Sequence, residues 1–226
     1  MIKTNYNDKE DLVDQNSDVF HIMKTMRPMR RLKPDPVPQE ILQEILDAAV
    51  HAPNSLNTQP YCFIVARDNV TKEMFGEKYH QAMSDRFSKY TPADDDNSAF
   101  ARNFRTAMAL GRHISEIPLL LFICGERDWP LAVPLAQRVG LAPPSYGSVF
   151  PTVQNILLGC RAKGLGASLT TMHQVFEAEL IEHLKIPETH GIVAVIPIGY
   201  PKGNFGPVTR KPSLELTHFE YWGETE

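Results

Sequence analysis

The sequence predicts a mixed α/β or α+β protein in which helices and a sheet pack in layers. Four strand-like segments are dispersed among five or six helix-like segments along the chain. The 226 residues are 42% hydrophobic, which is enough to bury a sizeable core, and no obvious linker divides them. We therefore expect a solvated tail over residues 1–15 and a single domain over residues 16–226.

The first helix is predicted from "SDVFHIMKTM", with Ser17 or Asp18 as its N-cap. The basic stretch "RPMRRLKPDPVPQE" follows, and its four prolines forbid a helix or a regular strand, so we expect a loop. In "PQEILQEILDAAVHA" the apolar side chains share one face with a 3.6-residue period, which predicts an amphipathic helix ending at Pro53. "YCFIVARD" then predicts a buried strand.

Two helices and a core strand are expected next. "TKEMFGEKYHQAMSDRFSKY" predicts a helix that is interrupted or kinked at Gly76, and an acidic surface loop separates it from the helix "AFARNFRTAMALGRHIS". "PLLLFICG" predicts a core strand. Residues 128–148 are rich in Pro and Gly and predict a long connection of the kind that lines or covers a site.

The last third of the chain supplies the rest of the sheet. "PTVQNILLGCRAKG" predicts a helix that starts at Pro151 and stops at Gly164. "GASLTTM" resembles a short strand, "HQVFEAELIEHLKI" predicts a helix, and "HGIVAVIPIGYP" is the longest strand signal. A tail rich in Gly and Pro then leads to the C-terminus.

Charge and cysteine content exclude several classes of protein. The net charge of −4 argues against nucleic acid as a partner, because binding a polyanion needs an excess of Lys and Arg. Cys62, Cys124 and Cys160 are odd in number and flanked by apolar residues, so we expect buried reduced thiols with no disulfide framework and no metal site. Apolar runs are far shorter than the ~20 residues of a membrane span, and no targeting segment is visible. We expect a cytoplasmic protein without membrane association.

A polar junction, "APNSLNTQP", joins a predicted helix to a predicted strand, and neither a GxGxxG loop nor a Walker pattern opens any helix. The stretch "MRPMRRLKPDPVPQEILQEILDAAVHAPNSLNTQPYCFIVARD" combines a basic cluster, a Pro-Val-Pro helix start and this junction. It resembles the N-terminal signature of the nitroreductase family of FMN-dependent enzymes. "GLGASLTTM", "IVAVIPIGYP" and "TRKP" follow in the family's order, so the resemblance runs from about residue 20 to 215.

The resemblance implies a three-layer α+β fold with a mostly antiparallel central sheet flanked by helices. It also implies a homodimer whose chains exchange C-terminal extensions and build each flavin site together. The predicted helix after Pro151 has more apolar surface than one buried face needs, and the tail regains a hydrophobic pattern only at Phe219, Tyr221 and Trp222. A frayed terminus on a monomer is the alternative.

The resemblance also implies roles for the basic residues. Arg27 would hold the FMN phosphate, Arg30 would lie near the phosphate or the flavin N1/O2 edge, and Arg210 of "TRKP" would complete the anion site. Where the family commonly has Arg-Arg-Ser-x-Arg, this chain has Met-Arg-Pro-Met-Arg, so one arginine and one hydroxyl are absent. Arg31 is a candidate to compensate for them.

The polar junction supplies groups that suit the rest of the cofactor. Asn57 and Gln59, expected on one side of an extended loop, carry donors and acceptors for ribityl hydroxyls or the pyrimidine edge, and Ser55 adds a hydroxyl. By the resemblance, Thr170 and Thr171 run past the flavin N5 edge, where a backbone N–H can hydrogen-bond to N5. Taken singly, the same residue types are also typical of solvated loops, turns and helix caps.

The implied activity is a ping-pong reaction in which NAD(P)H reduces bound FMN and a small oxidant takes the electrons back. It requires no side-chain acid, base or nucleophile and no metal. Nitroaromatics and quinones are the default acceptors, while dehalogenation and flavin destruction are other reactions of the family. A non-enzymatic module that binds flavin or protein is the alternative from another class. Four aromatic side chains are candidates for a substrate wall: Phe100, Phe104, Trp129 and Tyr146.

Overall fold

The computed structural model describes residues 18–127 and 144–225, with side chains in the second range from residue 147 onward. Its sheet has the strand order β1-β2-β4-β3, and each neighbouring pair is antiparallel, which confirms the predicted sheet. The strands are β1 (Tyr61–Ala66), β2 (Leu119–Glu126), β3 (Gly166–Ala167) and β4 (His190–Gly199). The expected N-terminal tail, residues 1–15, lies outside the described residues.

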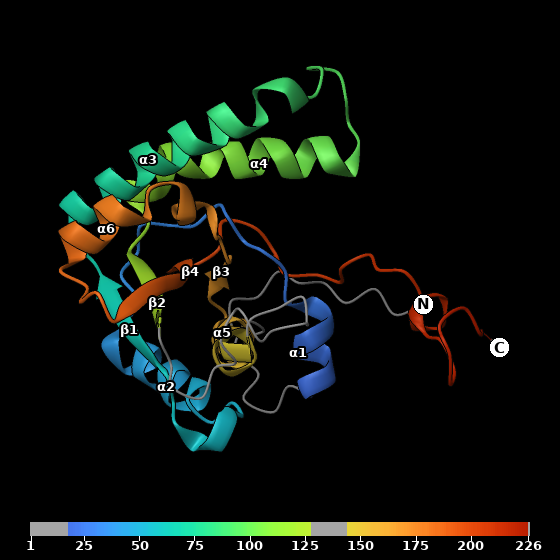
Figure 1. The fold of residues 1–226 in the computed structure, drawn as a ribbon. Helices are drawn as coiled ribbons and strands as arrows, with labels where there is room; N and C mark the ends of the chain where they lie inside the picture. Colours follow the sequence, from blue (N-terminus) through green and yellow to red (C-terminus); the bar gives the residue numbers. More distant parts are fainter. Residues whose placement is uncertain (1–17, 128–143, 226) are drawn as a thin grey trace.

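Helices cover both faces of the sheet. They are α1 (Val19–Thr25), α2 (Gln39–Ala49), α3 (Asn69–Phe87), α4 (Ala99–His113), α5 (Pro144–Ala162) and α6 (Glu177–Leu184). Figure 1 shows α3, α4 and α6 on one side of the sheet and α2 and α5 on the other. Successive side chains of a strand point to opposite faces, so β2 contributes Leu120 and Phe122 to one core and Leu121 and Ile123 to the other. The predicted three-layer fold is confirmed.

Helix α3 runs without interruption through Gly76, so the predicted break at this glycine is wrong. Gly76 is buried where α3 crosses the end of α4. A Cβ atom on Gly76 would lie 2.3 Å from the Ile114 side chain and 3.0 Å from the carbonyl oxygen of Gly111. The glycine therefore permits close approach of two chain segments, which a sequence pattern cannot distinguish from a helix break.

Helix α5 begins at Pro144, earlier than the predicted start at Pro151, and so takes over the end of the predicted 128–148 connection. Residues 128–143 of that connection lie outside the described residues. Pro151 is inside the helix, where it provides no N–H for the carbonyl of Gly147. Because Gly147 is exposed, water can bind that carbonyl, and the helix continues.

The predicted strand "GASLTTM" is regular only in β3. The chain then makes one isolated bridge, between Thr170 and Val195 of β4, and passes through a 3₁₀ turn, Met172–Val175, before α6. The helix predicted over "HQVFEAELIEHLKI" is therefore shorter than expected. Residues 168–172 of this irregular path line a cleft together with residues of α3 and α4.

The basic loop before α2 is held against the sheet at two points. The Met29 N–H donates to the Ala167 carbonyl at 2.9 Å, and the Lys33 N–H donates to the Tyr200 carbonyl at 2.7 Å. Between them, Leu32 forms an isolated bridge with Pro201. The predicted loop conformation is confirmed, and the contacts with β3 and the end of β4 order it.

The prediction for the three cysteines is partly wrong. All three are free thiols, and Cys124 and Cys160 are buried, but Cys62 is exposed. Cys62 lies on β1, an edge strand of the described sheet, directly opposite Cys124 on β2. Apolar neighbours in the sequence do not reveal where an edge strand extends beyond the helices that cover its face.

After β4 the chain stays on the body of the molecule as far as Phe205, which is buried in the core, and Val208, which contacts the end of α1, and then leaves it. Figure 1 shows the C-terminal segment, in red, running away from the sheet and its helices. Its large apolar side chains are exposed: Leu214, Leu216, Phe219, Tyr221 and Trp222. Separately, none of the helices in the described ranges has the length and apolar character needed to cross a bilayer.

Candidate functional site

A cleft of about 420 Å³ opens between α3, α4 and the segment that follows β3. Its polar lining consists of Arg30, Tyr79, Arg86, Ser168, Thr170, Thr171 and Gln174. Met83, Phe87 and Leu110 are among the apolar side chains that form the rest of its wall. The described part of this lining contains two guanidinium groups and no carboxylate, so the cleft favours a ligand that is anionic or rich in hydrogen-bond acceptors.

Arg30 is the cation that the fold directs into this cleft. The hydrogen bond between Met29 and Ala167 fixes the loop immediately before Arg30 against β3. Burial lowers the pKa of the Arg30 guanidinium, while the neighbouring Tyr79 opposes that shift. No carboxylate in the described part of the chain forms an ion pair with Arg30. A partly buried cation without a counter-charge is suited to an anionic ligand group.

Ser168 and Thr170 lie on the opposite wall. The Ser168 hydroxyl oxygen is buried and has no hydrogen-bond partner among the described residues, which is unusual for a protein interior. The backbone N–H of Thr170 donates to the Val195 carbonyl at 2.9 Å, so this N–H is not available to a ligand. Of the two predicted threonines, only Thr171 keeps a backbone N–H without an acceptor in the described residues.

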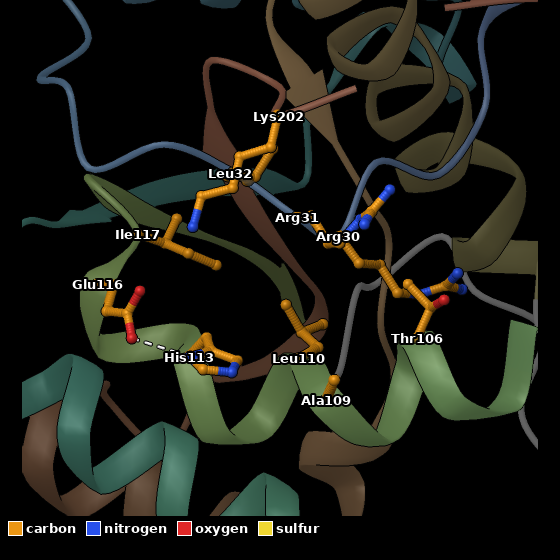
Figure 2. A pocket seen from close by; sticks show the side chains of 10 residues that line it. All are labelled: Arg30, Arg31, Leu32, Thr106, Ala109, Leu110, His113, Glu116, Ile117 and Lys202. Carbon is orange, nitrogen blue, oxygen red and sulfur yellow. Dashed lines mark hydrogen bonds and ion pairs between the residues drawn. The ribbon is translucent and has the colours of Figure 1, made fainter. Parts of the chain in front are cut away.

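A second, smaller pocket of about 180 Å³ lies on the other side of Arg30. Figure 2 shows Arg30 and Arg31 side by side, with the Arg30 guanidinium beside Thr106 and the Lys202 amine directed toward Glu116. Glu116 also accepts a hydrogen bond of 2.8 Å from His113. Arg30 lines both pockets, whereas Arg31 lines only the smaller one.

Arg27 and Arg210 line neither pocket, and both are exposed. They nevertheless lie in neighbouring segments, because the Val208 N–H donates to the Lys24 carbonyl at 3.4 Å and so brings the start of the C-terminal segment against the end of α1. Among the described residues, the Arg210 guanidinium donates to the Thr209 carbonyl alone, at 2.9 Å. The predicted anion site remains a prediction.

The polar junction lies far from the cleft within one chain. In Figure 1 the 3₁₀ turn Ser55–Asn57, in cyan, lies at the opposite end of the molecule from α3 and α4. Ser55, Asn57 and Gln59 are exposed, and none of them lines either pocket. The structure thus brings Arg30, Thr170 and Thr171 together in one cleft and leaves these three polar residues elsewhere.

The conformation of the junction differs from the extended loop that we expected. Leu56, Asn57 and Gln59 have φ angles of 50°, 55° and 49°, in the left-handed region that is uncommon for residues other than glycine. The Asn54 side chain holds the turn closed by accepting a hydrogen bond of 2.8 Å from the Gln59 N–H. The Asn57 and Gln59 side chains have no hydrogen bonds within the described residues. Strain of this kind is common where a loop meets a ligand or partner.

The aromatic wall is built differently from the prediction. Phe87 lines the cleft, and Phe104 packs behind it with a ring-centroid distance of 5.9 Å. Phe100 packs against Phe104 at 6.0 Å, one step further from the cleft. Trp129 and the side chain of Tyr146 lie outside the described residues.

Sequence reasoning missed four polar residues of the cleft lining: Tyr79, Arg86, Ser168 and Gln174. Tyr79, Met83 and Phe87 recur at four-residue spacing, which places them on one face of α3. That spacing marks a face but does not say whether the face meets a core or a cleft. Ser168 was indistinguishable from any small residue in a strand.

The chain belongs to the nitroreductase family, whose model matches residues 24–200. A relative from Methanothermobacter thermautotrophicus, provisionally named NADH dehydrogenase/NAD(P)H nitroreductase, is 27% identical over 208 residues that cover 91% of this chain and 88% of that protein. The iodotyrosine deiodinase of Nematostella vectensis is 28% identical over 225 residues, covering 92% of this chain and 77% of that protein. The predicted family is therefore confirmed.

The fold is also found in solved structures of the family. An iodotyrosine deiodinase crystallised with FMN and 3-iodo-L-tyrosine superimposes with a TM-score of 0.67 at 21% identity, covering 86% of this chain and 96% of that one. At 21% identity this likeness supports the shared fold alone.

Proposed function

We propose that this chain is an FMN-dependent oxidoreductase that oxidises NAD(P)H and reduces a small acceptor such as a nitroaromatic or a quinone. The observation that carries the proposal is the cleft. It contains the half-buried Arg30 and the buried Ser168 hydroxyl, which has no partner among the described residues, and none of the described residues that line it is a carboxylate. These groups fit an acceptor-rich flavin ring. Bound FMN would supply the redox chemistry, by taking up two electrons from the nicotinamide and releasing them to the acceptor.

The chain's own residues bind and orient the cofactor in this proposal. Arg30 places positive charge where negative charge develops on reduction, and Ser168 and Thr171 offer hydrogen bonds to the ring. Arg27, Arg31 and Arg210 remain the predicted contacts for the anionic phosphate end. The apolar wall that contains Phe87 limits access of water to the ring and gives a flat acceptor a surface to stack on.

A homodimer completes the site. Ser55, Asn57 and Gln59 do not line the cleft of their own chain, and the turn Ser55–Asn57 lies at the opposite end of the molecule from α3 and α4 in Figure 1. Their exposed and strained turn is suited to contact with a second chain, in whose site they would hold the ribityl chain or the pyrimidine edge. A two-fold dimer, the commonest closed assembly, would then give two equivalent sites.

Flavin binding is the first test. The purified protein should be yellow and should quench the fluorescence of added FMN at a ratio of one per chain. Arg27→Ala should weaken FMN binding by roughly 10–150-fold, because a hydrogen bond to a charged group contributes about 1.5–3 kcal/mol. Arg112→Ala, on an exposed turn of α4 outside the cleft, is the matched control and should leave binding unchanged. Colourless protein that does not bind FMN would refute the proposal and favour a non-enzymatic module.

The reaction class is the second test, because the matched relatives include both a nitroreductase and a deiodinase by name. Under anaerobic conditions NADH or NADPH should bleach the flavin absorption, and a nitroaromatic or quinone should restore it. Restoration only by halogenated phenols would favour dehalogenation. Reduction by dithionite but by neither nicotinamide would point to flavin destruction or another electron donor. We propose a cytoplasmic location, in keeping with three free thiols.

A further inference from the structure

Two of the three free cysteines lie opposite each other in the sheet. The antiparallel register of β1 and β2 pairs Cys62 directly with Cys124. Side chains that are directly opposite in an antiparallel pair share one face of the sheet. Cys124 belongs to the core that packs against α3, α4 and α6, so both thiols lie on that side of the sheet.

The separation expected for this pair suits a disulfide bond. The Glu126 N–H donates to the Pro60 carbonyl at 3.2 Å, and Cys62 and Cys124, two residues further along each strand, form the next hydrogen-bonded pair of the same ladder. The Cα atoms of such a pair are about 5.5 Å apart, within the range of roughly 4.4–6.8 Å that disulfides span. The Cβ atoms of opposite residues, about 4.5–5.5 Å apart, need to approach by only about 1 Å.

The two thiols differ in access, and this difference sets the order in which they react. Cys62 is exposed near the start of β1, an edge strand of the described sheet, whereas Cys124 is fully buried. Burial raises the pKa of the Cys124 thiol to about 12, so this thiol is almost entirely protonated near neutral pH. An oxidant in solution therefore meets the Cys62 thiol first.

We propose that Cys62 and Cys124 form a reversible disulfide when the protein meets a peroxide, with Cys124 as the thiol that resolves oxidised Cys62. The Cys62 thiolate attacks one oxygen of hydrogen peroxide, the O–O bond breaks, and hydroxide leaves and takes up a proton, which gives a sulfenic acid and water. The Cys124 sulfur then attacks the Cys62 sulfur and displaces hydroxide, which takes the Cys124 proton and leaves as a second water. Overall, the two thiols lose two electrons and two protons, and the peroxide is reduced to water.

The second step protects the exposed thiol. A sulfenic acid with no thiol within reach is oxidised further to sulfinic and sulfonic acids, which small thiols do not reverse. A disulfide is reopened by thiol exchange, and one whose Cβ atoms must be drawn together is easier to reduce than a relaxed one. A transient bond of this kind is compatible with a reducing compartment. The proposal does not depend on flavin binding.

Mass spectrometry of the full-length chain after treatment with hydrogen peroxide tests the proposal. The wild-type protein should lose the mass of two hydrogen atoms, a non-reducing digest should contain the Cys62 and Cys124 peptides joined, and dithiothreitol should restore both thiols. In Cys124→Ala the resolving thiol is absent, so Cys62 should gain two or three oxygen atoms that dithiothreitol does not remove. Cys160→Ala is the matched control and should behave as the wild type, because Cys160 is buried in the core on the other face of the sheet.

Cys62→Ser keeps the proposal testable if Cys124→Ala does not fold, since residue 62 is exposed. This variant should neither lose two hydrogen atoms nor yield a joined peptide. Three results in the wild type would overturn the proposal: no reaction with peroxide, irreversible gain of oxygen at Cys62 as fast as in Cys124→Ala, or a bond between the Cys62 residues of two chains in place of the bond to Cys124.

Discussion

Surroundings, more than residue type, determine what individual side chains of this protein can do. Arg30 and Arg31 are adjacent in the sequence, but only Arg30 lines the large cleft. The three cysteines differ in the same way. Cys62 is exposed, whereas burial raises the pKa of the Cys124 and Cys160 thiols to about 12. A thiol reacts through its thiolate form, so their reactivities should differ sharply.

We expect one fast-reacting thiol per native chain at pH 8 and three after unfolding, measured with a chromogenic disulfide reagent. Cys62→Ser should abolish the fast phase. The raised pKa of the Cys124 and Cys160 thiols also affects the free energy of unfolding. Because the ordinary pKa of these thiols is 9.0, their contribution to that free energy is complete below pH 9 and is lost as pH rises toward 12. Three fast thiols in the native protein, or a fast phase that survives Cys62→Ser, would contradict this assignment.

At the scale of elements, the sequence predicted the helices and strands well and their ends less well. Apolar periodicity identified α2 and the buried strands because burial of one face, or of both faces, is what the fold requires of them. It failed at Gly76, where we expected an interruption or kink, and at Pro151, where we expected a helix to start. Both residues lie inside helices, because close packing at Gly76 requires a glycine and because the carbonyl of Gly147, which loses its partner at Pro151, is on an exposed residue. The site was predicted in the same uneven way. Residues of the family motifs were identified from the sequence, whereas the positions of Tyr79 and Ser168 in the cleft depend on tertiary contacts that the sequence does not reveal.

The crossing of α3 with the end of α4 should depend on glycine. In Gly76→Ala the new Cβ would lie 2.3 Å from the Ile114 side chain, so the helices must separate, and we expect a loss of roughly 1–3 kcal/mol in the free energy of unfolding. Denaturant titration measures this free energy of unfolding. Gly147→Ala is the control, because a Cβ there meets nothing within 4 Å and alanine favours a helix. Equal stability of the two variants would show that α3 and α4 tolerate separation.

The whole molecule has features that a single chain does not explain. One end carries the cleft, the other carries the strained polar turn, and the C-terminal segment leaves the body with its large apolar side chains exposed. Trp222 is 91% exposed, and its ring contact, with His218 at 4.4 Å, lies within the same segment. Exposed apolar side chains in such number are typical of a surface that a partner covers. Each feature is accounted for if two chains exchange their C-terminal segments.

Truncation after Lys211 should therefore weaken the dimer and the flavin site together. The deletion removes the chain from Pro212 onward, including the exposed apolar segment, but leaves Arg210 and the cleft intact, so a loss of FMN affinity would have to pass through the second chain. Light scattering coupled to size exclusion gives the mass, and fluorescence titration gives the FMN affinity. Removal of residues 1–15 is the control and should change neither. A full-length protein that is monomeric with FMN fully bound would refute the shared site. A truncated protein that is monomeric yet binds FMN as tightly as the full-length chain would show that the segment serves assembly alone.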